Sequence, residues 1–111
     1  MSLKIEFPVD ASYDYPAVLR GSYAVTHFYA NIAREPFASV APEDGDRTVT
    51  FEAPIKADAP EAIIDGVRAL TMELFHESAR LSHEEWTDSL DRMVDQKMEK
   101  LAQLAEDLKE K

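Results

Sequence analysis

Apolar and polar residues alternate at the beginning of the chain. From residue 3 to residue 9 every second position is apolar, and these positions are Leu3, Ile5, Phe7 and Val9. A period of two predicts a strand with one buried face. Pro8 points away from that face and has no N–H to donate, so we expect the strand to lie at a sheet edge or to end there.

A helical period replaces this alternation after Asp14. We expect Asp14 to be the N-cap of a helix and Pro16 to lie in its first turn. The helix should end near Arg34, because Pro36 disfavours helical geometry in the residue before it. Its inward positions are Val18, Ser22, Val25, Phe28, Tyr29 and Ile32. Gly21 weakens the helix by about 1 kcal/mol relative to alanine, so we expect a close approach of a neighbouring element there.

Residues 37–55 have the pattern of a β-hairpin. A short apolar run over 37–40 leads into the turn-forming segment 42–46, which has Asp-Gly at its centre. Residues 47–53 then alternate, with Val49, Phe51 and Ala53 inward. Residues 47–53 therefore predict a strand, whereas 37–40 fit either a strand or an irregular segment.

Two further helices complete the predicted set. Asp58 and Glu61 have the form of a capping box at the start of the first one. Its apolar stripe contains Ile63, Ile64, Val67, Leu70, Leu74, Phe75 and Leu81. Ser82 and Glu85 repeat the capping pattern, so residues 80–82 should join the two helices in a hairpin. The last helix, about 40 Å long for about 27 residues, carries Trp86, Leu90, Met93, Val94, Met98, Leu101, Leu104, Ala105 and Leu108.

The expected order is strand, helix, two strands, helix, helix. We expect an α+β fold that forms one domain over residues 1–111. A small three-stranded sheet would be covered on one face by helices, and the chain would end in a helical hairpin with a long C-terminal helix. Strands of this length span only about 17–23 Å, so the last helix should extend well beyond the sheet.

The distal part of the last helix carries an apolar stripe that needs a cover. Its residues have the 3-4-3 spacing of a coiled-coil seam, and they are Met98, Leu101, Ala105 and Leu108. Either the first helix of the same chain covers them, or a second copy does and the stripe is the interface of a homodimer. Lys97 falls in the middle of the stripe, where a lysine either snorkels to solvent or indicates half exposure.

Composition narrows the possible functions. The 111 residues include 12 Lys and Arg, 22 Asp and Glu and no Cys, which gives a formal net charge of −10. Without cysteine there is no disulfide, thiolate zinc site or cysteine nucleophile. The negative charge argues against direct nucleic-acid binding, because that affinity comes mostly from cationic contacts to phosphate. With no signal-peptide layout and no apolar run near about 18 residues, we expect a cytoplasmic protein without a membrane partner.

Candidate catalytic and metal-binding residues are few. His27 and His76 project opposite the apolar stripes of their helices, and His83 opens the last helix, so all three should face solvent. Glu73 and His76 have the Glu-x-x-His spacing of di-iron bundles, but such sites need two copies with inward side chains. We therefore expect no metal, cofactor or catalytic residue. The alternative is a small metal- or ligand-dependent enzyme that uses Glu73, His76 and either His83 or Glu77.

The most unusual feature is a band of carboxylates on the last helix. Its members are spaced 4, 3 and 4 residues apart, and they are Glu84, Asp88, Asp91 and Asp95. Like charges at these spacings destabilise a helix by about 0.2–0.5 kcal/mol per pair. The band either keeps the protein dispersed in solution or presents negative charge to a basic surface of another protein.

These observations favour a small acidic, non-catalytic protein-binding module. We expect an inhibitor or adaptor that occupies a basic, nucleic-acid-binding surface of a partner protein. Tyr13, Tyr15 and Tyr23 join the expected surface, because exposed tyrosines are enriched at protein interfaces. A structural subunit that docks through its long last helix is a further alternative. Small accessory proteins of mobile elements that block nucleic-acid machinery have this general size and charge, although no motif identifies a family.

Overall fold

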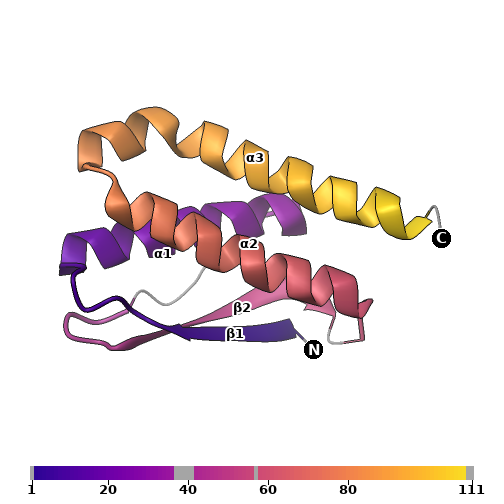
Figure 1. Cartoon of the computed structure of the whole chain (residues 1–111), viewed down its shortest axis with the longest axis horizontal. Helices are drawn as coiled ribbons and strands as arrows, with labels where there is room; N and C mark the ends of the chain where they lie inside the picture. The colour runs from indigo at the N-terminus through magenta and orange to yellow at the C-terminus, as the bar shows by residue number, and fades with distance from the viewer. Residues whose placement is uncertain (1, 37–41, 57, 110–111) are drawn as a thin grey trace.

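Two strands and three helices make up the fold in the computed structural model, which describes residues 2–36, 42–56 and 58–109. In chain order the elements are β1 (Ser2–Pro8), α1 (Tyr15–Ala33), β2 (Thr48–Lys56), α2 (Glu61–Arg80) and α3 (His83–Lys109). The strands form one layer, α1 and α2 lie against it, and α3 packs on the outer side of these helices (Figure 1). The predicted α+β class and the helical hairpin are confirmed.

The sheet has two antiparallel strands within the described residues. Its register pairs Ile5 with Phe51 and Phe7 with Val49, and all four side chains are buried against the helices. The alternation predicted for both segments is therefore confirmed. The expected strand over 37–40 lies outside the described residues, so the three-stranded sheet is not confirmed.

The turn before β2 has the predicted Asp-Gly chemistry. Gly45 adopts a φ of +94°, which glycine reaches without the steric cost that a Cβ would add. Asp46 Oδ2 accepts a hydrogen bond of 2.8 Å from the backbone N of Glu43, and the backbone N of Asp46 donates to Glu43 O at 3.1 Å. Acidic side chains in this turn therefore help to build it.

Two of the three predicted helix starts are confirmed. Asp14 Oδ1 accepts a hydrogen bond of 2.9 Å from the backbone N of Ala17 at the start of α1. At α3, Ser82 Oγ accepts from the backbone N of Glu85 at 3.2 Å, and Glu85 Oε1 accepts from the backbone N of Ser82 at 3.3 Å. This reciprocal pair is the expected capping box.

The capping box predicted at Asp58 is wrong. Pro60 is the N-cap residue of α2, and no side chain caps that end. The reason is local: the backbone N of Ala59 donates to Lys56 O at 3.1 Å. The helix therefore begins at Glu61, after this bond, and too late for Asp58 to reach its first N–H groups.

The distal stripe of α3 is covered in part by α2. The Cδ1 atom of Leu104 lies against Gly66 near the start of α2, and Met98 and Leu101 pack against the core. All four residues of the expected dimer interface are half-buried by the chain itself: Met98, Leu101, Ala105 and Leu108. The antiparallel helix α2 thus supplies part of the cover, and the homodimer stays a prediction.

No helix among residues 2–36, 42–56 and 58–109 is long and apolar enough to cross a membrane.

Candidate protein-binding surface

The acidic band lies on the exposed side of α3 and approaches α1 at Asp91. All four of its residues, Glu84, Asp88, Asp91 and Asp95, are exposed. Asp91 Oδ1 lies 3.6 Å from Nε2 of His27 on α1, and the Asp91 side chain is 92% exposed. This contact is an ion pair only when the imidazole carries a second proton.

The band has no lysine or arginine partner among the described residues. The ion pairs of Lys97 and Lys100 are instead made with α2, on the other side of α3. Arg92 follows Asp91 directly and is exposed, and it has no ion pair in the described part of the chain. The carboxylates therefore repel one another with little compensation from the protein itself.

An open apolar groove of about 630 Å³ lies between α1 and α3. It begins at Pro16 and His83, and the side chains that line the rest of it are Leu19, Arg20, Tyr23, Trp86, Thr87 and Leu90. Tyr23 is 59% exposed and is the large hydrophobic side chain most open to solvent in the described chain. Its ring meets that of Trp86 edge to face, with centroids 5.5 Å apart.

The groove and the acidic band are neighbours on one face of the molecule. The two helices run in parallel, since Tyr23 contacts Trp86 and, one turn further along both helices, His27 contacts Asp91. Successive residues of a helix are about 100° apart around its axis. Around the axis of α3, Leu90 and Thr87 come next to the buried side and line the groove. The acidic band comes after them. The structure thus combines an apolar surface with a flanking row of negative charge.

Two buried donors at the groove have no hydrogen-bond partner among the described residues. They are Nε1 of Trp86 and Nε of Arg20. A buried polar group without a partner costs about 1–3 kcal/mol, and such groups are few in folded proteins. Both belong to residues that line this groove, so two polar groups of its walls are free to bond to a group that enters it.

The structure does not bring Tyr13 and Tyr15 together with Tyr23 at the groove. The Tyr15 hydroxyl donates to Pro42 O at 3.1 Å, and the Tyr13 hydroxyl is 3.0 Å from Nδ1 of His76. Both tyrosines line a separate cavity of about 740 Å³ with an acidic rim. Of the three predicted tyrosines, only Tyr23 adjoins the band, because it lies two turns further along α1.

His76 does not face solvent as predicted. It is half-buried, bonded to Tyr13, and its ring contacts Phe7 and Phe75 with centroids 5.9 and 5.6 Å away. A helical projection of α2 cannot show this, because the cover comes from Tyr13 before α1 and Phe7 on β1. His83 is exposed as predicted, and His27 is half-exposed beside Asp91.

The two side chains of the Glu-x-x-His motif have different partners. His76 bonds to Tyr13, whereas Glu73 accepts hydrogen bonds from Lys97 and Lys100. Within the described residues, no group of three or more His, Cys, Asp or Glu side chains is placed to hold a metal ion. The alternative of an enzyme centred on Glu73 and His76 therefore gains no geometric support.

The environment of His76 makes folding sensitive to pH. Burial and then the positive charge of Arg80 lower the pKa of His76, and Asp10 opposes this in part. The unfolded chain, with a histidine pKa of about 6.5, thus binds the proton more readily than the folded chain. We expect the stability that neutral His76 contributes to be complete above the pKa of the unfolded chain. That contribution should be lost as the pH falls through the lower pKa of the folded state.

Chemical unfolding between about pH 7.5 and pH 5 tests this expectation. The His76→Gln variant keeps a polar partner for Tyr13 but cannot titrate. It should therefore show a smaller loss of stability than the wild type over that interval. Equal losses in the two proteins would assign the pH dependence to other groups.

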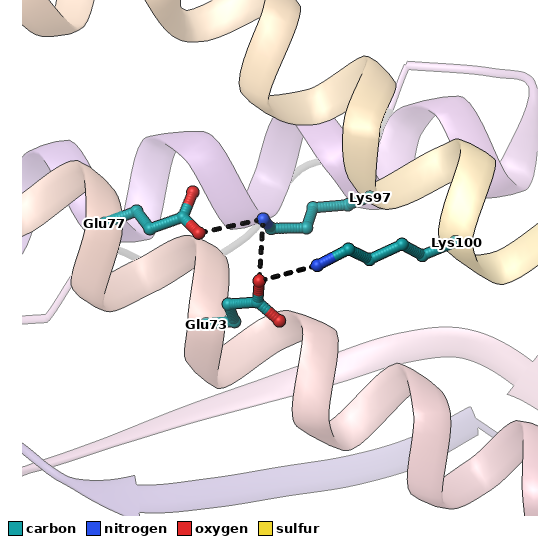
Figure 2. Close-up of polar contacts among 4 residues, drawn as sticks. All are labelled: Glu73, Glu77, Lys97 and Lys100. Carbon is teal, nitrogen blue, oxygen red and sulfur yellow. Dashed lines mark hydrogen bonds and ion pairs between the residues drawn. The ribbon is translucent and has the colours of Figure 1, made fainter.

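Lys97 is the largest departure from the sequence-based expectation. Its side chain is 1% exposed, and Nζ lies 3.0 Å from Glu77 Oε1 and 3.2 Å from Glu73 Oε1 (Figure 2). Lys100 Nζ adds a third contact to Glu73 Oε1 at 2.9 Å. Hydrogen bonds from Lys100 and Lys97 hold the pKa of Glu73 below its ordinary value against the opposing effect of burial. Lys97 therefore joins α3 to α2 and does not extend to bulk solvent.

Comparison with protein-family models, with curated proteins and with solved structures finds no match for this chain. The functional inference therefore rests on the α1–α3 face, which combines the groove between α1 and α3 with the acidic band.

Proposed function

We propose that this protein is a small acidic, non-catalytic protein-binding module. Its α1–α3 face binds a basic surface of a partner protein. The observation that carries this proposal is the acidic band beside an open apolar groove, with no lysine or arginine of the described chain paired to it. Complementary charge speeds association and opposes wrong partners.

The energetics of the band favour an external cation. Four carboxylates at helical spacing destabilise α3 through mutual repulsion. Help from the helix N-terminus reaches Glu84 but fades beyond the first turn, so Asp91 and Asp95 receive none of it. A partner that supplies lysine or arginine side chains removes this repulsion on binding.

The partner surface that fits best is one that also binds phosphate. Proteins that bind nucleic acid present clustered lysine and arginine side chains to the backbone. A row of carboxylates on a rigid helix meets the same side chains. The protein then acts as an inhibitor or adaptor that occupies the nucleic-acid-binding surface of its partner.

Charge reversal within the band tests the proposal. We expect a variant with Asp88→Lys, Asp91→Lys and Asp95→Lys to lose the partners that wild-type protein retains from a native extract. The matched control reverses Asp44, Glu52 and Asp58, which are exposed and have no ion pair in the described chain. Both variants change the net charge equally, so a general effect of charge would appear in both.

The readout is the quantity of each retained protein at low and at high salt. Partners lost from the band variant alone should be basic proteins, and salt should release them from the wild type. Circular dichroism checks that both variants fold. If the two variants retain the same proteins, the band serves only to keep the protein in solution.

A further inference from the structure

The α1–α3 groove indicates what kind of partner segment binds there. We infer that it takes a basic amphipathic helix, whose apolar side enters the groove while its lysines or arginines meet the acidic band. This inference rests on the proposed function and names the partner element of the same surface.

The apolar part of the groove has the length of a short helical contact. On α3 it extends from His83 to Leu90, which is two turns and about 10.5 Å of helix rise. On α1 it covers about the same length, from Pro16 to Tyr23. Two turns accept apolar side chains at positions i, i+3 or i+4, and i+7 of a docked helix, which is the spacing used when helices bind in grooves.

The row of carboxylates next to the groove has the same length as the groove and runs in the same direction. From Glu84 through Asp88 to Asp91 the row extends over seven residue-to-residue steps of α3, again about 10.5 Å. A helix that lies along the groove can therefore place basic residues one and two turns apart opposite these carboxylates. A single lysine would pair with only one or two of these carboxylates, and an uncharged helix would pair with none.

Other occupants fit the surface less well. A second copy of this chain carries a net charge of −10, so its approach is repelled by the band. An extended strand gains affinity from backbone hydrogen bonds to a sheet edge, and both walls of this groove are helices whose backbone groups bond internally. An anionic membrane surface is repelled by the same carboxylates.

Arg20 gives the groove a direction. It lines the groove and also the adjoining pocket at Leu81 and Ser82, so its cationic guanidinium lies at the end of the groove near the start of α3. The C-terminal carbonyl groups of a helix are unpaired and carry partial negative charge. A docked helix is therefore favoured with its C-terminus near Arg20 and its basic side chains along the band.

Trp86 provides a local readout of docking. It is the only tryptophan in the chain, and it lies in the groove in contact with Tyr23. Aromatic residues in the centre of an interface often dominate binding energy. A side chain that enters the groove changes the surroundings of the indole and hence its fluorescence.

The test uses synthetic peptides of about 18 residues, long enough to form helix on binding. One series carries leucines at i, i+4 and i+7 with lysines on both flanks of that stripe, in several leucine spacings. The control peptides have the same composition in an order that breaks the amphipathic pattern. We expect at least one amphipathic peptide to shift Trp86 fluorescence and to bind about tenfold more tightly than its control.

Protein variants separate the groove from the band. Tyr23→Ala and Leu90→Ala should each weaken binding of the amphipathic peptide about tenfold. Leu108→Ala, half-buried at the far end of α3, should leave it unchanged. Circular dichroism of the free variants shows that they remain folded.

The outcomes distinguish the two proposals. Equal binding of amphipathic and control peptides, or normal binding by Tyr23→Ala and Leu90→Ala, overturns the groove inference. The proposed function survives that result if reversal of Asp88, Asp91 and Asp95 still abolishes partner binding. If that reversal leaves every basic peptide and every partner bound as before, the proposed function fails as well. Absence of binding by all amphipathic peptides also overturns the groove inference.

Discussion

Lys97→Glu should lower the free energy of unfolding by about 3–5 kcal/mol, which is the usual cost of leaving a buried charge without its counter-charge. The substitution places a third carboxylate beside Glu73 and Glu77, where the side chain of residue 97 is 1% exposed. Domains of this size have a total stability of about 5–15 kcal/mol. Denaturant titration followed by Trp86 fluorescence should therefore show a large decrease in the midpoint.

Two controls show whether burial is the cause. Lys100→Glu reverses the same charge one turn along α3, at a side chain that is 54% exposed, so we expect a loss of about 1 kcal/mol or less. Lys97→Met removes the charge but keeps an unbranched side chain of similar length. Replacement of a buried ion by an apolar side chain is often neutral or stabilising, and Glu73 and Glu77 are partly open to water. A Lys97→Glu variant as stable as Lys100→Glu would contradict the buried network.

The second large effect is expected at Gly21, where α1 crosses α2. A Cβ atom at this position would lie 2.6 Å from Cδ2 of Phe75. Phe75 is fully buried and its ring contacts Phe7 at 5.3 Å, so the ring has little room to move. Gly21→Ala should therefore destabilise the protein by about 1–3 kcal/mol, as overpacking of a core does, although alanine is the better helix former.

Gly66→Ala is the matched control for this substitution. Gly66 also lies within a helix, and an added Cβ would meet only the Cδ1 end of Leu104, which is half-buried. A leucine terminus can rotate away, so the gain in helix propensity of about 1 kcal/mol should offset the contact. Equal losses at Gly21 and Gly66 would show that the Phe75 contact is not the cause.

Both positions affect the proposed binding face through the placement of helices. Gly21 lies on α1 between Leu19 and Tyr23, which line the groove. Lys97 fixes the register of α3 against α2, and α3 carries the band. A change in either contact shifts one wall of the groove relative to the other, so weaker partner binding should accompany the loss of stability.

Local sequence pattern correctly predicted the features that form within a single helix or strand. Asp14 and the Ser82–Glu85 pair cap their helices as predicted, because a cap is made within a few residues. Ile5, Phe7, Val49 and Phe51 are buried as predicted, because alternation assigns each strand one apolar face. The acidic band was predicted as well, since helical spacing alone places these carboxylates together.

The groove could not be predicted from the sequence. Tyr23 lies off the apolar stripe of α1, and Trp86 and Leu90 belong to the stripe of α3. Nothing local shows that these side chains form one open surface, because their meeting depends on the parallel packing of α1 and α3. The one sequence signal for the groove was the expected exposure of Tyr23, and the same expectation applied to Tyr13 and Tyr15.

Local sequence pattern was sufficient to predict the α+β class, the helix starts at Asp14 and Ser82, the buried alternation of the strands and the acidic row on the last helix. Each of these depends on residues within a few turns of one another. Three features follow from the packing of the helices: α2 covers part of the distal stripe, Lys97 is buried beside two glutamates, and His76 shares a hydrogen bond with Tyr13. These contacts join residues 20 or more positions apart. Their geometry depends on how whole helices pack, which no local pattern encodes.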